Sequence, residues 1–342
     1  MTIAPVSAPI PPFLPAPFLS GPHRQTIWGR LVRSRDLVAL RRERLEAPDG
    51  ERLVLDHAGE EGSPRLLVLH GLEGSSRSVY VQGMAAAALA RGLAVTVLNF
   101  RSCAVEGNGR TVAVTRPRLY HSGETADLDH VARTLAARSP GLPLVAVGVS
   151  LGGNALLKWL GENPAQPFVA AAATVSVPYD LEAGSRFLEC PSGRLYVEVF
   201  LKTLRGKSRD LCARFREARE RIDIHRLELA QTFWDLDDAA TGPLHGFAGA
   251  DDYYARSSSV GFLSRVATPT LCLSATDDPF LPPSALTRVR AAASKAVTLV
   301  EVPRGGHAGF VGGESLFRPS YWAEEAVIGW LAAAVSEENA RA

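Results

Sequence analysis

Short apolar runs alternate with longer segments of helical periodicity along most of this chain. The runs consist almost entirely of apolar or β-branched residues and lie at 66–69, 93–98, 144–147 and 297–302. Such runs are typical of strands that are covered on both faces. The stretches between them, at 78–91 and 127–138, carry apolar residues at helical spacing. This alternation predicts the α/β class, with a mostly parallel central sheet flanked by helices.

The alternation breaks between residues 179 and 260, where the segment is rich in charge and typical of helices. Sheet-like sequence resumes at 270–274. We therefore expect 179–260 to be a helical cap inserted between two parts of one α/β core, 45–178 and 261–338. The charges of this cap have both signs, which is typical of a face exposed to water.

An arm of residues 1–44 precedes the core, with six prolines in its first twenty positions and no charge before Arg24. We expect this arm to be extended and to pack on the core rather than to fold by itself. Prolines at this density also argue against a signal peptide or a membrane helix. No other window approaches the roughly 18–20 apolar residues that span a bilayer, so we expect no integral membrane segment and a cytoplasmic location.

Composition narrows the range of partners. The chain has 342 residues, of which 46% are hydrophobic and 21% charged, and its net charge is +1. These values are those of an ordinary globular protein and exclude wholesale disorder. A net charge near zero gives no electrostatic reason to expect nucleic acid or an anionic membrane as a partner. We expect a small and mostly neutral substrate.

The pentapeptide Gly148-Val-Ser150-Leu-Gly152 is the first candidate for chemistry. It follows the predicted strand 144–147 and precedes a helical stretch at 154–160. In this context G-x-S-x-G forms a nucleophile elbow, because the serine occupies a strained turn that larger neighbours would obstruct. The start of the helix also directs positive charge at a developing oxyanion. Ser150 is therefore predicted to be a nucleophile.

Candidate partners for Ser150 follow in the order that such an elbow demands, Ser, Asp, His. Asp277 and Asp278 come after one predicted strand, and His307 comes after the next. The carboxyl ends of parallel strands meet at one edge of a sheet, so we expect these groups to converge on Ser150. The imidazole of His307 would take the serine proton, and a carboxylate would hold the ring in the required tautomer.

A second glycine-containing turn, His-Gly-Leu-Glu-Gly at 70–74, follows the predicted strand 66–69. In hydrolases with a nucleophile elbow, a loop of this kind supplies one backbone N–H of the oxyanion hole, and the residue after the nucleophile supplies another. We therefore predict main-chain donors at Leu72 and Leu151. The alternative is a glycine-rich turn with no part in binding.

Several further segments resemble one known family. They are Gly21-Pro-His-Arg-Gln-Thr26, Asn99-Phe-Arg-Ser-Cys103, Arg118-Leu-Tyr-His-Ser-Gly-Glu124, His245-Gly-Phe247, Asp252-Tyr-Tyr254 and Gly306-His-Ala-Gly-Phe310. Together these motifs are similar to those of the YheT-type α/β-hydrolases, the family 4 branch of that superfamily. The similarity extends over about residues 12–335.

This resemblance implies the α/β-hydrolase fold and carboxylic-ester hydrolase activity, with a triad of Ser150, Asp278 and His307. Some members of the family hydrolyse phospholipids or transfer acyl groups to alcohols. The chain departs from the family pattern at Ser102, where glycine is usual, and in a longer loop at 106–116. Both departures lie near the expected pocket and bear on substrate specificity rather than on the triad.

Two other functions stay open at this point. Acyl transfer to an alcohol uses the same acyl-enzyme, and a hydrolase fold can also serve for binding alone. We expect no metal, because the eight histidines show no H-x-x-x-H or comparable cluster, and no other cofactor. The acyl-chain length, the alcohol portion and the oligomeric state are not determined by these patterns.

His121 and the apolar residues of the cap are the remaining candidates for a role near the site. We expect a structural role for His121 rather than the alternative, a contact with substrate. It lies beside a helix that Ser122 or Thr125 caps and whose positive end Glu124 favours. We also expect apolar residues of the cap to form one wall of the substrate pocket: Phe187, Leu188, Tyr196, Phe200, Phe233, Trp234 and Phe247. The alternative for each of them is that it only packs the cap against the core.

Overall fold

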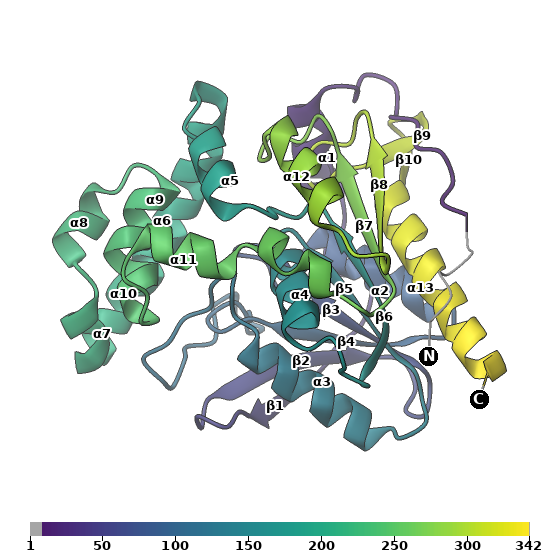
Figure 1. The fold of residues 1–342 in the computed structure, drawn as a ribbon, viewed down its shortest axis with the longest axis horizontal. Coiled ribbons are helices and arrows are strands. Elements are labelled where there is room, and N and C mark those ends of the chain that lie inside the picture. The colour runs from purple at the N-terminus through teal and green to yellow at the C-terminus, as the bar shows by residue number, and fades with distance from the viewer. Residues whose placement is uncertain (1–8, 342) are drawn as a thin grey trace.

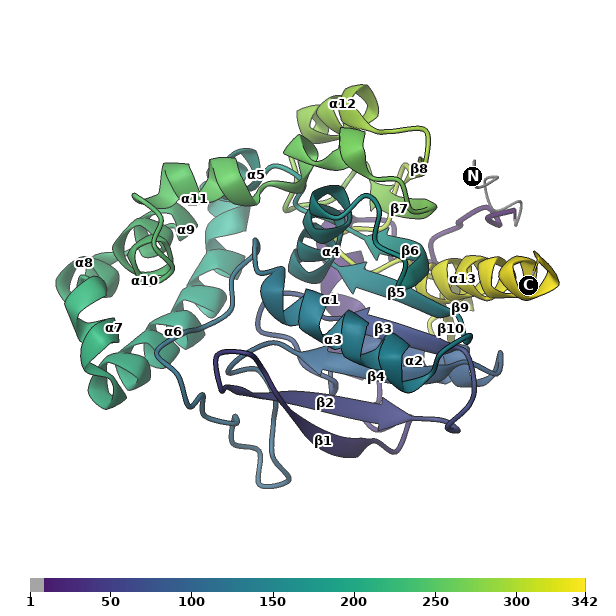
Figure 2. The same ribbon diagram turned by 60° about the horizontal axis from the view of Figure 1, so that its bottom comes forward.

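The apolar runs form a twisted sheet through the middle of the molecule, with helices on both of its faces (Figures 1 and 2). The computed structural model describes residues 9–341, in which eight strands pair in the order β1-β2-β4-β3-β5-β6-β7-β8. The strands are β1 (Arg41–Glu46), β2 (Arg52–Ala58), β3 (Arg65–Leu69), β4 (Ala94–Asn99), β5 (Leu144–Val149), β6 (Val169–Val175), β7 (Thr270–Ala275) and β8 (Val297–Val302). Only the β1–β2 and β2–β4 pairs within this sheet are antiparallel, so the predicted mostly parallel sheet is confirmed.

Two layers of helices explain why the strand sequences lack polar alternation. One face of the sheet packs against α3, α4 and α12, and the other packs against α2 and α13. These helices are α2 (Val79–Leu89), α3 (Ala126–Arg138), α4 (Leu151–Glu162), α12 (Pro283–Ala292) and α13 (Trp322–Arg341). In β3, Leu67 and Leu69 belong to the first layer, whereas Leu66 and Val68 belong to the second. Successive side chains of a strand point to opposite faces, so a strand between two layers is apolar throughout.

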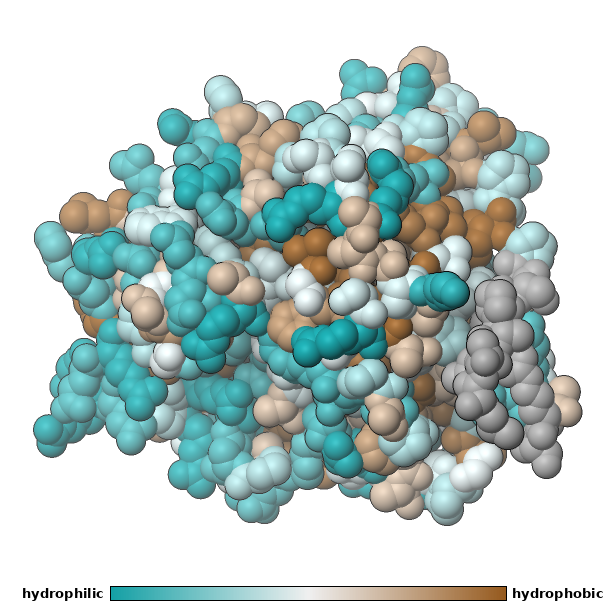
Figure 3. Space-filling view, viewed as in Figure 1, coloured by the Kyte–Doolittle hydropathy of each residue, from teal (hydrophilic) through white to brown (hydrophobic). Residues whose placement is uncertain are grey.

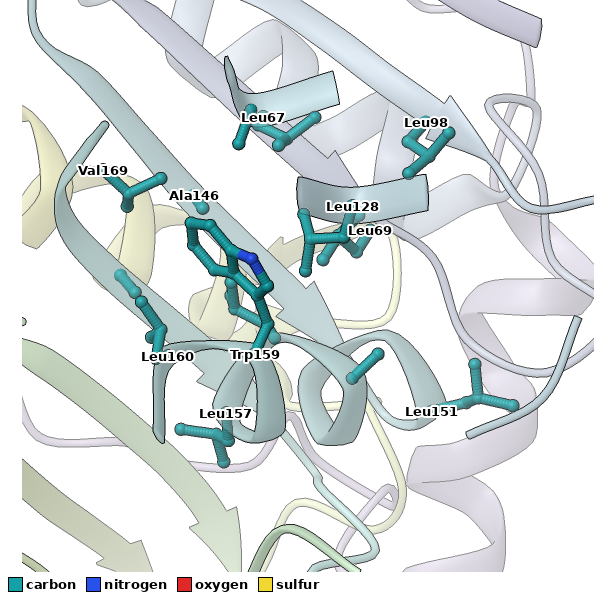
Figure 4. Packing of buried hydrophobic residues seen from close by; sticks show 14 of the residues in the cluster. Leu67, Leu69, Leu98, Leu128, Ala146, Leu151, Leu157, Trp159, Leu160 and Val169 are labelled. Atoms are coloured by element: carbon teal, nitrogen blue, oxygen red, sulfur yellow. The ribbon is translucent and has the colours of Figure 1, made fainter. Parts of the chain in front are cut away.

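Trp159 of α4 lies within the first of these layers (Figure 4). The residue is fully buried, and its indole N–H donates a hydrogen bond to Asp129 of α3 at 3.1 Å. Leu67 and Leu69 of β3 belong to the same cluster. Burial of each apolar side chain of this size stabilises the fold by about 1.5–3 kcal/mol. This packing fixes the position of α4 and of its first residue, Leu151.

Between β6 and β7 the chain forms a lobe of helices at one end of the sheet (Figure 1). The lobe contains α5 (Leu181–Phe187), α6 (Pro191–Arg214), α7 (Arg216–Arg221), α8 (Ile224–Leu229), α9 (Phe233–Leu236), α10 (Gly242–Leu244) and α11 (Ala250–Ser257). An apolar cluster of its own includes Val197, Leu201 and Leu211 of α6. The surface of the lobe is mostly hydrophilic (Figure 3). Residues 179–260, the cap segment, contain these helices, and their role as a cap over a site remains a prediction.

Asn154 of α4 joins the cap segment to the core. Its side chain is fully buried and donates hydrogen bonds to the carbonyls of Ser122 and Ser257 at 2.9 and 2.8 Å. Its Oδ1 accepts a hydrogen bond from the amide of Ser259 at 2.9 Å. Buried polar groups are stable only when they are paired in this way, so these bonds define where the cap segment returns to the core.

The arm is less extended than the sequence predicted. Residues 22–32 form α1 (Pro22–Val32), and β1 begins at Arg41, inside the predicted arm. The buried residue of α1 is the polar Gln25, so no apolar periodicity signals this helix. Gln25 holds α1 on the core: its amide group donates to the carbonyls of Leu19 and Val311 and accepts from the amide of Val311.

Three parts of the sheet structure carry weak sequence signals. The strand β6 has the alanine-rich sequence Val-Ala-Ala-Ala-Ala-Thr-Val, and the edge strand β1 is mostly charged. A small hairpin of β9 (Val311–Ser315) and β10 (Arg318–Tyr321) follows the main sheet and was not anticipated.

Within residues 9–341, none of the helices combines the length and the apolar character that a membrane span requires.

Ser102 stands where the family usually has glycine, and its surroundings predict how the stability of the fold changes when glycine is restored. It has a φ of 65°, and its buried hydroxyl has no hydrogen-bond partner among the described residues. The left-handed conformation costs about 1–2 kcal/mol for a residue with a Cβ, and a buried unpaired hydroxyl adds to that cost. We expect Ser102→Gly to raise the free energy of unfolding in urea by about 1 kcal/mol, after allowance for the greater freedom of glycine in the unfolded chain.

Ser176 supplies the matched control. It is also buried with a positive φ, 53°, but its hydroxyl accepts a hydrogen bond from the amide of Ala308 at 2.9 Å. Ser176→Gly loses that bond and is not expected to stabilise the protein. A Ser102→Gly variant that unfolds at lower urea concentrations than the wild type would contradict the prediction.

Candidate active site

Ser150 lies in the tight turn between β5 and α4, with a φ of 52° and a ψ of −120°. This backbone conformation is unfavourable for a residue with a side chain. A Cβ on Gly148 would lie 2.5 Å from the carbonyl oxygen of Gly152, and a Cβ on Gly152 would lie 2.5 Å from those of Leu69 and His70. Both glycines of the pentapeptide are therefore required by close packing.

His307 and Asp278 reach Ser150 from the ends of β8 and β7. Nε2 of His307 lies 2.9 Å from Oγ of Ser150, and Nδ1 lies 2.9 and 3.1 Å from the two carboxylate oxygens of Asp278. The side chains of His307 and Asp278 are 14% and 1% exposed, so these hydrogen bonds are shielded from bulk water. The structure thus brings the three predicted residues together, while their catalytic roles remain a prediction.

The neighbouring carboxylate of Asp277 has different partners. It accepts a hydrogen bond from the amide of Gly306 at 2.9 Å, whereas Asp278 accepts from the amide of Phe280 at 2.8 Å. Burial raises the pKa of Asp277, and the nearby charge of Asp278 raises it further. Asp277 therefore shapes the loop that carries His307, and Asp278 is the carboxylate that faces the ring.

Helix α1 of the arm supports the same loop. The hydroxyl of Thr26 accepts a hydrogen bond from the amide of His307 at 2.9 Å. A Cβ on Gly306 would lie 2.4 Å from the carbonyl oxygen of Pro22, so the loop packs against α1 without spare room. Sequence reasoning recognised 21–26 only as part of a family resemblance and missed its support of His307.

The turn at 70–74 that is predicted to supply an oxyanion donor, the oxyanion turn, lies directly beside Ser150. A Cβ on Gly71 would lie 3.2 Å from the Cβ of Ser150. The turn is closed by a hydrogen bond from the amide of Gly74 to the carbonyl of Gly71 at 3.0 Å. The amide of Gly71 itself donates to the hydroxyl of Tyr80 at 2.8 Å. These hydrogen bonds hold Gly71 and Gly74, which flank Leu72 and Glu73 at the tip of the turn.

Neither of the two predicted main-chain donors has a protein acceptor among the described residues. The amide of Glu73 donates to the hydroxyl of Tyr120 at 2.8 Å, but that of Leu72 has no acceptor among the described residues. Leu151 is the first residue of α4, so its amide has no partner within the helix. Both amides are free to bind a ligand.

His70 supports the turn from the core side. It is fully buried, its Nδ1 donates to the carbonyl of Gly71 at 2.8 Å, and its Nε2 accepts from the amide of Phe100 at 3.0 Å. The second hydrogen bond requires an unprotonated Nε2 and hence a neutral ring. Burial lowers the pKa of His70 to about 4, which agrees with that state.

His121 packs between the core and the cap segment. It is 8% exposed, and its ring centroid lies 4.5 Å from that of His245 and 5.6 Å from those of Phe247 and Tyr253. Burial holds the pKa of His121 well below its usual value. These contacts are those of a neutral packing residue and agree with the structural role expected for it.

The helix that follows His121 is capped differently from expectation. Neither Ser122 nor Thr125 binds the free amides at the start of α3. The carboxylate of Glu124 accepts a hydrogen bond from the amide of Ala126 at 2.9 Å instead. A negative group at this end is favoured by the helix dipole, and the longer side chain of glutamate reaches the amide from outside the helix.

The arrangement contains the groups that acyl transfer needs. A serine hydroxyl contacts an imidazole, the imidazole contacts a buried carboxylate, and two amides beside the serine are free. Within the part of the chain that the structure describes, no group of three or more His, Cys, Asp or Glu residues is arranged to hold a metal ion. Chemically, the site can activate a hydroxyl and stabilise an oxyanion next to it.

Comparisons with known proteins give independent information about the family. A family model described as "alpha/beta hydrolase fold" matches residues 64–314. The chain is 36% identical over 323 residues to "Putative esterase YheT" of Escherichia coli (strain K12), covering 93% of this chain and 92% of that protein. It is 32% identical over 302 residues to phospholipase ABHD3 of Mus musculus, covering 84% of this chain and 71% of that protein.

A solved structure shows the same fold at a greater distance. The crystal structure of the 2,6-dihydroxy-pseudo-oxynicotine hydrolase matches with a TM-score of 0.55, covering 92% of this chain and 72% of that chain. The sequence identity is 16%, so this likeness concerns the fold alone. The predicted resemblance to YheT-type proteins is confirmed by the relatives rather than by this structure.

The neutral state of His70 predicts a pH dependence of stability. In the unfolded chain the ring has a pKa of about 6.5, and in the folded protein its pKa is about 4. Between these two pH values the unfolded state binds a proton at His70 and the folded state does not. The stability from this group is fully present above about pH 6.5 and is lost as the pH falls toward 4, by about 2–3 kcal/mol. His70→Gln keeps an acceptor for the amide of Phe100 but does not titrate.

Urea unfolding of the wild type and of His70→Gln at several pH values between 7 and 4.5 measures this effect. Other buried histidines are present in both proteins and cancel in the difference. The stability advantage of the wild type should shrink as the pH falls. A difference that stays constant over this range would contradict the assignment of a neutral, pH-sensitive His70.

Proposed function

The chain belongs to the α/β-hydrolase fold family, and we propose that it hydrolyses carboxylic esters through a covalent acyl-enzyme on Ser150. The observation that supports this most strongly is the hydrogen-bonded series from Ser150 through His307 to Asp278. A serine hydroxyl is a poor nucleophile and becomes reactive when an adjacent imidazole takes its proton. Relatives named as an esterase and a phospholipase support ester chemistry in particular.

In the acylation step, Oγ of Ser150 attacks the ester carbonyl carbon while Nε2 of His307 takes the hydroxyl proton. Asp278 holds the proton-bearing Nδ1 toward its carboxylate and stabilises the imidazolium. The tetrahedral oxyanion accepts hydrogen bonds from the amides of Leu72 and Leu151, and the positive end of α4 favours its charge. His307 then passes its proton to the departing alcohol, which leaves the acyl group on Ser150.

Deacylation repeats these steps with water as the nucleophile. His307 removes a proton from water, which attacks the acyl carbon, and the same two amides stabilise the second oxyanion. Collapse of this intermediate returns the proton to Ser150 and releases the acid. An alcohol in place of water would complete an acyl transfer by the same route, so access to the acyl-enzyme decides between the two outcomes.

A row of aromatic rings leads from the proposed base into the cap segment. The ring centroid of Phe280 lies 4.2 Å from that of His307, and Tyr196 follows 4.9 Å beyond Phe280. Phe200 lies 6.5 Å from Phe280 and 6.0 Å from Phe233. These four aromatic residues, the aromatic row, are all partly exposed. Partly exposed rings in a row that begins at the proposed base are suited to hold an apolar acyl chain.

Other cap residues expected at this wall have different neighbours. Trp234 donates its indole N–H to Asp251 at 2.8 Å and packs with Phe247 against Tyr253 and Tyr254. These contacts lie among the helices of the cap segment itself. We therefore assign acyl binding to the aromatic row and a packing role to Trp234.

The central test of this function is the Ser150→Ala variant. It should lower kcat for p-nitrophenyl acetate by on the order of 10⁴-fold or more, because no acyl-enzyme can form without the hydroxyl. A residual rate above that of the solution reaction is expected from the oxyanion donors and from binding. Release of p-nitrophenol at saturating ester measures the effect, and turnover close to that of the wild type would refute the assignment.

The two neighbouring aspartates provide an internal control for that experiment. Asp278→Asn should damage turnover far more than Asp277→Asn, because only Asp278 contacts the ring of His307. Both substitutions preserve size and remove one charge at adjacent positions. The reverse ranking would move the orienting role to Asp277.

Acyl-chain preference tests the aromatic row. Phe200→Ala should lower kcat/KM for p-nitrophenyl octanoate relative to the acetate ester by about 10- to 200-fold, equivalent to about 1–3 kcal/mol of lost pocket contact. Trp234→Ala removes a ring of the cap segment outside the row and is the matched control. It should lower the melting temperature while changing octanoate and acetate turnover equally. Equal losses on both esters for Phe200→Ala would show that this ring serves packing alone.

A further inference from the structure

Helix α6 of the cap segment sends one charged side chain to the oxyanion turn. Nζ of Lys207 donates a hydrogen bond to Oε1 of Glu73 at 2.5 Å and lies 3.5 Å from Sγ of Cys103. The same ammonium lies 5.4 Å from the centroid of the Tyr120 ring. Glu73 directly follows Leu72, whose amide is one of the proposed oxyanion donors. A cap residue is thus bound to the turn one position away from that donor.

The ion pair of Lys207 and Glu73 is shielded from water. Their side chains are 14% and 13% exposed. Burial lowers the pKa of Lys207, but Cys103 and Glu73 outweigh it and raise the pKa overall, so the ammonium stays charged. Burial raises the pKa of Cys103 to about 11, so the thiol stays neutral near pH 7. A shielded pair is weak evidence for added stability, because desolvation offsets the attraction of its charges. The position of the ion pair beside the oxyanion turn points to a role in holding the conformation of that turn.

Glu73 needs such support because of its backbone conformation. It has a φ of 55° at the third position of the turn that the Gly74–Gly71 hydrogen bond closes. Glycine or asparagine usually takes this position, since a Cβ makes the left-handed conformation unfavourable. The hydroxyl of Tyr120 accepts from the Glu73 amide and donates to its carboxylate, both at 2.8 Å. Lys207, which belongs to the cap segment, binds the same carboxylate oxygen.

We propose that Lys207 is a positioning residue: by holding the carboxylate of Glu73, it keeps the turn in the shape that directs the Leu72 amide at the oxyanion. This inference rests on the proposed function and adds a dependence of the oxyanion site on the cap segment. The site is complete only when α6 is seated on the core. The same helix carries Tyr196 and Phe200 of the aromatic row, so acyl binding and oxyanion stabilisation share one support.

The variant Lys207→Met keeps most of the length of the side chain and removes its charge. We expect kcat for p-nitrophenyl acetate to fall by about 10- to 100-fold with KM changed less than about twofold, since complete loss of one oxyanion donor costs about 10²- to 10³-fold. The affinity for an aryl trifluoromethyl ketone, which forms an oxyanion adduct with the serine, should fall by the same factor. Lys207→Arg should restore part of both losses.

Lys202→Met provides the matched control, because Lys202 is exposed on the same helix. It should leave kcat, KM and the ketone affinity at wild-type values. A rise in KM for Lys207→Met at unchanged kcat would place Lys207 in the substrate pocket and contradict the inference.

Lys207→Met alone leaves a shielded carboxylate without its cation and can fail to fold for that reason. The double variant Lys207→Met with Glu73→Gln removes both charges and keeps an amide that can bond to Tyr120. It should melt close to the wild type and still show the loss of kcat and of ketone affinity. Wild-type kcat and ketone affinity in this double variant would show that the pair is only structural and would overturn the inference.

A fluorophosphonate probe separates this inference from the proposed function. Labelling of wild-type Ser150 together with ester turnover upholds the function, and the Lys207 variants then decide the inference alone. A wild type that neither labels nor hydrolyses p-nitrophenyl acetate would overturn the function and the inference with it.

Discussion

The reversal of the chain at Ser150 is the constraint on which the rest of the site depends. The strand β5 ends and α4 begins within one residue, so the backbone takes a φ of 52°, and Gly148 and Gly152 have no room for side chains. This strain persists because β5 lies inside the parallel sheet and α4 is held by the packing around Trp159. A nucleophile on such a support keeps its direction before any substrate arrives, which is what preorganised catalysis requires.

The other groups reach this point by two different routes. Asp278 and His307 follow β7 and β8, whose carboxyl ends share an edge of the sheet with β5, so topology alone brings them near. The arm and the cap segment come from outside the sheet and are joined to the loops by polar contacts. Thr26 binds the amide of His307, and Lys207 binds the residue after the proposed donor Leu72. Each of these two contacts holds a loop of the site in place from outside the sheet.

Features of the fold and the site were predictable from the sequence when the residues that form them are close together in the chain. Five of the strands, β3, β4, β5, β7 and β8, and the position of Ser150 were predictable because apolar runs and the G-x-S-x-G motif are local signals. The charged β1 and the alanine-rich β6 lack such a signal. The choice of Asp278 over Asp277 required the family resemblance, since only the direction of the side chain separates them. The contact of Thr26 with His307 spans 281 positions, and that of Lys207 with Glu73 spans 134. One polar residue in a helix leaves no periodic signal, so such contacts appear only in the structure.

The most direct measurement is the identification of the residue that carries the acyl group. The wild type is incubated with p-nitrophenyl dimethylcarbamate, whose carbamoyl-enzyme hydrolyses slowly, then quenched in acid, digested with trypsin and analysed by mass spectrometry. The relevant peptide is 139–158, between the cleavage sites after Arg138 and Lys158. The account predicts that one carbamoyl group replaces one hydrogen on this peptide and that fragment ions place it on Ser150. Release of p-nitrophenol with the carbamoyl group on another residue, or with an unmodified peptide, would contradict it.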